Sequence, residues 1–390
     1  MRVGIDARAF SNINRFRGIG RYTGHLLRSL LETGGRELEP VLFTCRDARG
    51  DGEYAGHAAE PKIVCFQELL VVQVPALGRY SWPGMLAEHI LFARRVAEAR
   101  VDLFHGIDHN LSPFLPKPFL VTVHDLILLV LRGPYLGPNS WAWMEFHRAA
   151  ARRAERVIAV SQNTARDVME IWKIPEDRVE VVPEGVSADF HPRGEAEIRE
   201  ALPLYGIERP YLLYLGGYDP RKNILNLLLG FKELLKAGAS APGDGLRLVL
   251  AGPMEGLRGG VEDAVLETGL QDKVVFAGYV EEAHLPALYS GASAFVNVSV
   301  YEGFGLPLLE AMACGTPVVA SRASSYPELV GEAAVLVDPR DPHDIARGLA
   351  EALEEGTARD LSRRGRERAS GYTWERTALR ILEIYRKVLS

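Results

Sequence analysis

Tyr301–Glu310 reads Y-E-G-F-G-L-P-L-L-E, and its neighbours show what kind of structure it belongs to. A β-rich apolar run, Ala294–Ser299, comes shortly before it. A short apolar run, Pro307–Cys314, overlaps its end and continues beyond it. Pro307 suits the first position of a helix, because the missing N–H costs nothing there and φ is already right. The sequence therefore predicts a strand, a glycine-containing turn and a helix, which is the repeating unit of parallel α/β proteins.

The turn before this helix has the properties of an anion site. Unpaired N–H groups and the positive end of the helix dipole favour phosphate there, and the two glycines let a ligand approach the backbone. Glu302 and Glu310 bracket the turn, and we expect them to bind sugar hydroxyls because carboxylates do not suit a phosphate site. The alternative is a joint with two solvated glutamates. The candidate ligand amides are those of Gly303, Phe304, Gly305 and Leu306.

The same alternation of β-rich runs and helical patterns extends over all 390 residues. It loses register in the charged segment Arg193–Arg209, so we expect two doubly wound domains joined near residue 195. The candidate strands of the first half are Arg2–Ala7, Pro40–Cys45, Lys62–Cys65, Asp102–His105, Phe119–His124, Val157–Ser161 and Val179–Pro183. Those of the second half are Tyr211–Leu215, Leu246–Ala251, Val274–Phe276, Ala294–Val298, Pro317–Ala320 and Val335–Val337.

Composition is that of an ordinary globular protein, with 47% hydrophobic and 25% charged residues. The net charge of −6 argues against general nucleic-acid binding. Cys45, Cys65 and Cys314 are far apart and have no metal spacing, which fits a reducing cytosol.

No stretch reads as a signal peptide or a membrane span. Met1–Asp6 has an acid too early for a signal sequence, and Phe119–Leu131 is interrupted by His124-Asp125 and is too short. We therefore expect a cytoplasmic protein. Leu69–Leu86 leaves peripheral contact with the inner membrane face open, although a packed loop is the favoured explanation.

Gly18–Gly24, G-I-G-R-Y-T-G, has glycines spaced as in a dinucleotide-binding turn. They lie about ten residues beyond the predicted strand end at Ala7, so a tight turn is excluded. The next strand ends Phe43–Arg46, F-T-C-R, without the acid expected for a ribose. The context thus argues against a dinucleotide site, and a glycine-rich helix start is the alternative to a functional loop.

Histidines end two of the predicted strands. Ligands of open α/β sheets bind beyond the carboxyl ends of strands, so we expect His124 to face the crevice. A satisfied polar residue is the alternative. His105 is similarly placed, and we expect His109 at the surface.

Arg221 and Lys222 lie between the predicted strand Tyr211–Leu215 and the predicted helix Ile224–Lys236. Cations at a helix N-terminus oppose the dipole, so a bound anion gives them a reason to be there. An exposed, solvated pair is the alternative, but the local conflict favours an anion site.

E-G-F-G-L-P-L-L-E resembles the E-x7-E motif of the retaining glycosyltransferases of family 4. Further segments resemble that family in the same order: Gly18–Thr23, His124-Asp125, Val182–Pro192, Pro220–Asn223 and Phe276–Val280. One departure is Glu184, which stands where the family usually has Asn. The resemblance implies the GT-B fold, in which two Rossmann-like domains face a central cleft. It implies domains of residues 1–193 plus 373–390 and of residues 194–372, because the last helix, Trp374–Leu389, returns to the first domain.

The resemblance also implies roles for the candidate residues. His124 and Glu302 would contact the donor hexose as catalytic residues, and Glu310 would hold the ribose. Arg221 and Lys222 would bind the diphosphate. The remaining donor-binding candidates are Gly18 and Gly20 in a loop that closes over the phosphates, Val280 beside the base, and Gly303, Phe304, Gly305 and Leu306.

The implied reaction is transfer of a hexose from a nucleotide diphosphate sugar to a hydroxyl of a glycan, lipid-linked or small-molecule acceptor, without a cofactor. GDP-mannose is the favoured donor because many relatives with these segments are mannosyltransferases, and UDP-glucose or a UDP-hexosamine comes next. An epimerase, a phosphorylase and a non-catalytic nucleotide-sugar binder are the alternatives. The acceptor loops, Leu69–Met85 and Gly133–Trp143, carry no readable code.

We expect no metal site, because the sequence has no D-x-D and no His/Cys cluster with ligand spacing. Arg221, Lys222 and the amides of the turn would then meet the charge of the leaving diphosphate. No carboxylate is placed as a nucleophile, so we expect attack on the same face of the sugar, assisted by the leaving phosphate.

Overall fold

The computed structural model describes residues 1–11, 18–45, 70–74, 82–131, 138–238, 245–252 and 258–390. They form two compact units, Met1–Gly185 with Trp374–Ser390, and Val186–Thr373. The first boundary lies eight residues before the predicted one (193 − 185), and the second lies one residue after it (373 − 372). Residues 186–193 go with the second unit because the Val186 N–H donates to the Tyr372 carbonyl (3.0 Å) and the Phe190 ring packs edge-on against Tyr289.

The first unit is built on a parallel sheet of seven described strands in the order β3-β2-β1-β4-β5-β6-β7. The strands are β1 (Arg2–Asp6), β2 (Glu39–Cys45), β3 (Leu70–Val74), β4 (Leu103–Gly106), β5 (Phe119–Val123), β6 (Arg156–Ala159) and β7 (Val179–Val181). The helices are α1 (Gly18–Gly34), α2 (Trp82–Glu98), α3 (Ile127–Val130), α4 (Pro138–Arg153), α5 (Gln162–Glu170) and α14 (Trp374–Leu389).

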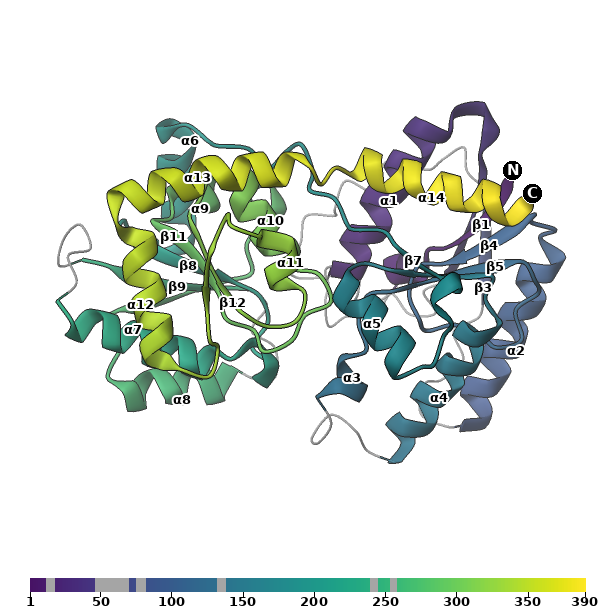
Figure 1. Cartoon of the computed structure of the whole chain (residues 1–390), viewed down its shortest axis with the longest axis horizontal. Coiled ribbons are helices and arrows are strands. Elements are labelled where there is room, and N and C mark those ends of the chain that lie inside the picture. The colour runs from purple at the N-terminus through teal and green to yellow at the C-terminus, as the bar shows by residue number, and fades with distance from the viewer. Residues whose placement is uncertain (12–17, 46–69, 75–81, 132–137, 239–244, 253–257) are drawn as a thin grey trace. The chain divides into compact units, whose positions relative to one another are not determined.

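Helices cover both faces of this sheet (Figure 1), so alternate side chains of its buried strands belong to two different layers. Phe104 and Val121 join a core with Phe92 of α2 and Met144 of α4. On the opposite face, His105 contacts Tyr385 of α14, which packs with α1. The last helix therefore packs on the first unit, which is where the GT-B resemblance places it.

The second unit repeats this construction with a parallel sheet of six described strands in the order β10-β9-β8-β11-β12-β13. The strands are β8 (Tyr211–Leu215), β9 (Arg247–Ala251), β10 (Val274–Gly278), β11 (Ala294–Asn297), β12 (Val318–Ser321) and β13 (Val335–Val337). The helices are α6 (Glu195–Ala201), α7 (Ile224–Lys236), α8 (Arg258–Thr268), α9 (Leu285–Gly291), α10 (Leu306–Ala313), α11 (Tyr326–Val330), α12 (Pro342–Leu353) and α13 (Glu355–Ser370).

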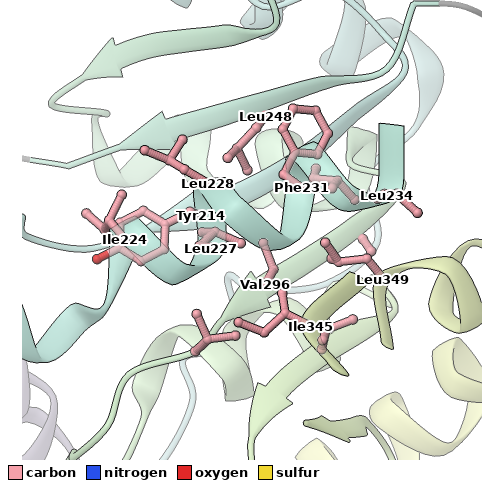
Figure 2. Packing of buried hydrophobic residues seen from close by; sticks show 14 of the residues in the cluster. Tyr214, Ile224, Leu227, Leu228, Phe231, Leu234, Leu248, Val296, Ile345 and Leu349 are labelled. Atoms are coloured by element: carbon pink, nitrogen blue, oxygen red, sulfur yellow. The ribbon is translucent and has the colours of Figure 1, made fainter. Parts of the chain in front are cut away.

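Figure 2 shows the core that α7 and α12 form against one face of this sheet. Leu227 and Phe231 recur at the helical spacing of four and are fully buried, and each such side chain contributes roughly 2 kcal/mol. Gly230 lets the two helices approach, because a Cβ there would lie 2.5 Å from Ile345. This packing fixes the start of α7 against the sheet. Arg221 and Lys222, which come just before α7, are fixed with it.

These two sheets confirm the predicted α/β class of two doubly wound, Rossmann-like domains. Twelve of the thirteen predicted strands fall on described residues and are strands within one or two residues of the predicted ends, and the thirteenth, Lys62–Cys65, lies outside them. The structure corrects both predicted acceptor loops. Leu69–Met85 contains β3 and the start of α2, and the end of Gly133–Trp143 belongs to α4. No helix of the described residues is long and apolar enough to cross a bilayer.

Candidate active site

The candidate residues of the second unit lie where its strand order reverses. β8 and β11 are neighbours in the sheet, although the chain continues from β8 outward to β9 and β10. In open α/β sheets, the helices after two such strands leave on opposite faces, and ligands bind beyond the carboxyl ends of the strands at this point. Arg221 and Lys222 follow β8, and Glu302 follows β11, so both loops lie at this reversal of strand order.

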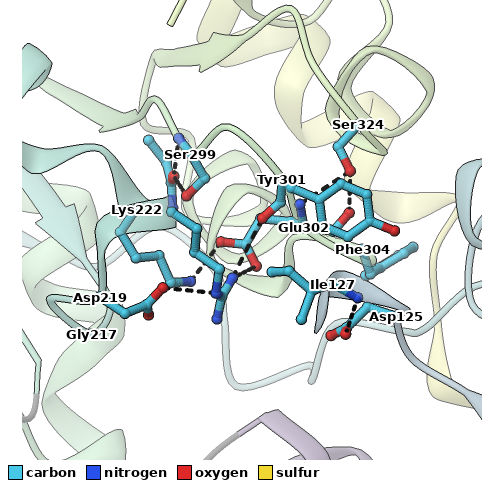
Figure 3. Close-up of polar contacts among 12 residues, drawn as sticks. Asp125, Ile127, Gly217, Asp219, Lys222, Ser299, Tyr301, Glu302, Phe304 and Ser324 are labelled. Atoms are coloured by element: carbon cyan, nitrogen blue, oxygen red, sulfur yellow. Dashed lines mark hydrogen bonds and ion pairs between the residues drawn. The ribbon is translucent and has the colours of Figure 1, made fainter. Parts of the chain in front are cut away.

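Four charged side chains form one cluster at this point (Figure 3). The carboxylate of Glu302 accepts from Arg221 Nη1 at 2.7 Å through Oε2 and from Lys222 Nζ at 2.6 Å through Oε1. Arg221 Nε lies 2.9 Å from Asp219 Oδ1. The cluster of two cations and two carboxylates is neutral without any ligand. The structure thus brings three predicted site residues together and adds Asp219, which the sequence prediction did not single out.

Burial and ion pairing act in opposite directions on Glu302. Burial raises the pKa of its carboxyl, but the charges of Lys222 and Arg221 and their hydrogen bonds outweigh burial and hold the pKa below its usual value. Glu302 is therefore an anion at neutral pH, and its two oxygens are occupied by cations instead of being directed to solvent.

The loop of Glu302 is held by two serines after β12. Ser324 accepts from the Glu302 N–H at 3.1 Å, and both Ser324 and Ser325 donate to the Glu302 carbonyl. Ser325 also donates to the Phe304 carbonyl at 2.8 Å. These contacts set the backbone of the turn independently of the ion pairs.

The predicted anion turn leads into α10, with a small shift from the expected start. Leu306 is the first helical residue and Pro307 the second, so the prediction of Pro307 in first place was wrong by one residue. Gly305 precedes the helix with φ of +122°, and a Cβ there would lie 2.8 Å from Tyr326, so only glycine fits. Phe304 is buried against Tyr372. The role of Gly303–Leu306 as phosphate ligands stays a prediction.

Glu310 lies one turn into α10 and is 1% exposed. Its Oε2 accepts from the Tyr289 hydroxyl of α9 at 2.9 Å. This contact ties α10 to α9, so the carboxylate has a structural partner in addition to the ribose that we predicted for it.

The segment before α7 is a turn of 3-10 helix, Pro220–Lys222, followed by Asn223 in the left-handed conformation. The Asn223 side chain does not cap α7. It donates to the carbonyls of Val298 and Pro339, which ties the cationic turn to the loop after β11. Gly252, after β9, packs beneath this region, where a Cβ would lie 2.0 Å from the Gly216 carbonyl oxygen.

Val280 follows β10 and is buried, with Tyr279 exposed beside it. The predicted contact of Val280 with the base stays a prediction.

In the first unit, Gly18 and Gly20 lie in the first turn of α1, so the expectation of a loop was wrong for these residues. Gly18 is exposed and open to solvent on its Cβ side, whereas Gly20 is buried. The helical alternative weighed for this segment therefore describes it correctly, and phosphate binding by these glycines stays a prediction.

His124 follows β5 and is largely buried, with contacts at both ring nitrogens. Nδ1 lies 3.1 Å from Glu184 Oε1, and Nε2 lies 2.9 Å from the Ile107 carbonyl oxygen. The ring packs edge-on against Tyr22 of α1, with 4.7 Å between the ring centroids. The structure therefore gives a partner to Glu184, the residue at which the sequence departs from the family pattern.

Two other histidines differ from expectation. His105 is fully buried, and its ring nitrogens contact the hydroxyls of Tyr385 (2.7 Å) and Thr122 (2.9 Å), so it is a satisfied core residue. His109 was expected at the surface but is half-buried, because it packs against Trp172 and pairs with Asp108 at 3.1 Å. The sequence pattern alone did not distinguish these environments.

Among the described residues, no group of three or more His, Cys, Asp or Glu side chains is placed to hold a metal ion. The arrangement in the second unit can instead offer two cations to an anionic ligand, provided that Glu302 releases them. Its position where the strand order of a Rossmann-like sheet reverses suits the phosphates of a nucleotide.

Comparisons with known proteins agree with this reading. Residues 16–190 match the family described as Glycosyltransferase Family 4, and residues 196–368 match Glycosyl transferases group 1. O-antigen chain mannosyltransferase B of Escherichia coli is 32% identical over 95% of this chain and 96% of its own length. The serotype-specific mannosyltransferase WbdA of the same species is 27% identical over 100% of this chain, which spans 48% of WbdA.

Among solved structures, Anabaena Alr3699/HepE in complex with UDP and glucose superposes with a TM-score of 0.75 at 18% identity, covering 98% of both chains. This likeness supports the GT-B fold, and the sequence matches span nearly the whole chain. The chain belongs to the group 1 glycosyltransferases and contains the family 4 domain, so it is a glycosyltransferase.

Proposed function

We propose that this glycosyltransferase moves mannose from GDP-mannose to a hydroxyl of a growing glycan, with retention of configuration at the anomeric carbon. The observation that carries the proposal is the cluster of Arg221, Lys222 and Glu302 beyond the carboxyl ends of the neighbouring strands β8 and β11. It offers two cations for a diphosphate and, in the loop after the adjacent strand, a carboxylate suited to sugar hydroxyls.

The cluster suggests how the donor would bind. The diphosphate would take Arg221 and Lys222 from Glu302, since a diphosphate carries more charge than one carboxylate. Glu302 would then be free to accept hydrogen bonds from the hexose hydroxyls. The exchange keeps an anionic partner on both cations and gives Glu302 hydrogen bonds from the hexose hydroxyls, which matters because a charge without a polar partner is costly in a partly buried site.

The same cations would serve the chemical step. The bond between the anomeric carbon and the β-phosphate oxygen breaks, and the acceptor oxygen bonds to that carbon on the same face. The acceptor proton passes to the departing phosphate. Negative charge grows on that phosphate, so Arg221 and Lys222 bind the transition state more tightly than the ground state. We propose that this charge makes a divalent ion unnecessary, and we expect activity to survive a chelator.

Mannose is supported by the names of the sequence relatives, which are mannosyltransferases at about 30% identity. UDP-glucose is the second candidate, because the structural neighbour HepE was solved with UDP and glucose. Nothing in the described side chains around Val280 selects guanine over uracil.

The test is calorimetric titration with GDP-mannose, UDP-glucose and UDP-N-acetylglucosamine, followed by transfer assays with the donor that binds. GDP-mannose should bind tightest, and GDP should be released only when an acceptor is present. Release without acceptor or interconversion of the donor would indicate a different reaction, and binding without product across an acceptor panel would indicate a binder. Retention is read from the anomeric configuration of the product by NMR.

We also propose that the protein acts in the cytoplasm and touches the inner membrane face through its first unit. Leu86 and Ile90 of α2 and Trp141 of α4 are 43%, 48% and 54% exposed, and lipid-linked acceptors would be found there. Cosedimentation with anionic liposomes should fall for the double variant Leu86→Ser/Ile90→Ser. Equal cosedimentation of the variant and the native chain would contradict membrane contact through this face.

A further inference from the structure

His124 has two hydrogen-bond partners, and both of them accept. The Ile107 carbonyl, which follows β4, can only accept from Nε2. The Glu184 carboxylate accepts from Nδ1 when it is ionised. A neutral imidazole has one N–H, so it satisfies one of these partners, whereas an imidazolium satisfies both.

The proton that completes the pair belongs on the histidine. If Glu184 carried it, a neutral His124 could accept from the carboxyl at Nδ1 and donate from Nε2. Histidine is the stronger base by about two pH units in ordinary peptides, so the imidazolium–carboxylate form is favoured. Both groups are buried, which penalises each lone charge but not the close pair to the same degree.

The groups around the ring also favour the protonated form of His124. Burial lowers the pKa of His124, but the hydrogen bond and charge of Glu184, the charge of Asp108 and the Ile107 carbonyl outweigh it, and the pKa is raised. Three further titratable groups face the His124 ring: His109 from the loop that carries Ile107 and Asp108, His105 from β4, and Tyr22 from α1. His105 is the contrast: its partners are hydroxyls that can donate or accept, and burial lowers its pKa to about 3.

The position of Glu184 is set by the fold instead of by His124. Pro183, its neighbour, accepts at its carbonyl from Thr377 Oγ1 of α14 at 2.8 Å. On the other side, Thr164 Oγ1 donates to the His124 carbonyl at 3.1 Å, and Ser161 caps the helix that carries Thr164. Both partners are therefore held by secondary structure, and the ring cannot turn without losing two hydrogen bonds.

We propose that Glu184 is a positioning residue that keeps His124 as an imidazolium, a fixed positive charge beyond the carboxyl end of β5. With both N–H groups engaged, His124 acts through its charge and takes no proton from the acceptor. This rests on the proposed function, in which the transferred sugar leaves a diphosphate. Because the ring takes no proton, the departing phosphate is the group that accepts the acceptor's proton.

The consequence for the sequence is specific. A neutral amide at position 184 could not stabilise a charge on the ring. The Glu184 carboxylate can, so the departure from the family pattern changes the protonation state of His124.

The test is the charge state of His124, measured by ¹⁵N NMR of the histidine side chains in the full chain, with the signals assigned through His124→Gln. We expect both ring nitrogens to be protonated at pH 7 and the titration midpoint to lie above the ordinary value of about 6.5. Glu184→Gln keeps the shape and can donate to Nδ1, so His124 should become a neutral Nε2–H tautomer. The exposed Glu176→Gln is the matched control and should leave the spectrum unchanged.

Activity gives the second readout. Glu184→Gln should lower kcat about tenfold, less than the roughly hundredfold loss that follows removal of a donor in direct contact, with little change in donor KM. A neutral, single-tautomer His124 in the native chain, or unchanged kcat in a Glu184→Gln variant whose His124 is neutral, would overturn the proposal. A charged His124 in a chain that does not use GDP-mannose would instead contradict the proposed donor alone.

Discussion

Each unit holds a carboxylate against basic side chains beyond the carboxyl ends of its strands, but in different ways. In the second unit, Glu302 is shared by Arg221 and Lys222, whose long side chains can reorient toward another anion. In the first unit, Glu184 holds the rigid ring of His124, whose other nitrogen is fixed by the Ile107 carbonyl. The first arrangement can be exchanged for a ligand, whereas the second is locked.

This difference suggests that the cluster of the second unit binds the ligand, whereas the pair of the first unit provides a preorganised charge. An exchangeable cluster can bind a diphosphate and release it again after transfer, because both cations have an anionic partner in each state. A locked charge costs no reorganisation when the reaction proceeds, which is the property that makes fixed electrostatics effective in catalysis. The predictions below test the exchangeable and the locked arrangement in turn.

The largest effect is expected at Lys222. Lys222→Ala should raise the barrier by about 3 kcal/mol, roughly a hundredfold in kcat, because charge on the leaving phosphate is greatest in the transition state. Steady-state kinetics with saturating donor measures the loss, and Lys236→Ala on the exposed end of α7 is the matched control. Near-normal turnover in the Lys222 variant would place the diphosphate elsewhere.

Glu302→Gln should also act mainly on kcat, with a loss of roughly tenfold or more. The hexose gains positive charge as its bond to phosphate breaks, so an anionic partner binds it more tightly along the reaction. Measurement of both kcat and donor KM shows whether Glu302 acts in the transition state or in donor binding. A rise in KM at unchanged kcat would show that Glu302 binds the donor equally in both states.

Glu310→Gln should mainly raise the donor KM, by about fivefold to tenfold, because a ribose contact is similar in the ground and transition states. Tyr289→Phe removes the hydroxyl that donates to Glu310 and leaves the carboxylate itself in place. If Glu310 serves only to join α10 to α9, both variants should instead lower the melting temperature and leave KM unchanged.

The smallest effect is expected in the stability of the first unit. A histidine whose folded pKa is raised stabilises the fold fully below its unfolded pKa of about 6.5, and this contribution is lost as the pH rises through the folded pKa. Glu184→Gln should therefore cost about 1–2 kcal/mol at pH 6 and progressively less toward pH 9. Thermal unfolding at several pH values measures the difference from the native chain. A difference that grows with pH would have the wrong sign.

The strands were predictable because buried parallel strands are short, nearly continuous runs of apolar residues between polar turns. β8, for example, begins and ends as predicted. The candidate cations and carboxylates could also be predicted, since the sequence gives their residue types and their positions relative to the strands and helices. β3 was missed because its run was assigned to an acceptor loop.

The pairing of these charges could not be predicted. Arg221 and Glu302 are 81 residues apart, and they meet because β8 and β11 are neighbours in the sheet. Glu184 and His124 are 60 residues apart and meet across the ends of β5 and β7. Sequence patterns report local periodicity, so which charge neutralises which, and whether a histidine is buried neutral or held as a cation, depends on the order of strands.

The claim that Glu302 holds the cations that bind the donor is tested most directly by the affinity of free GDP, which has the diphosphate but no hexose. Calorimetry on the native chain, Lys222→Ala and Glu302→Gln separates the two roles. We predict that GDP binds more weakly to the Lys222 variant and roughly fivefold more tightly to the Glu302 variant, in which the cations lose their competing partner. GDP affinity that is unchanged in both variants, or lower in the Glu302 variant, would contradict the exchange.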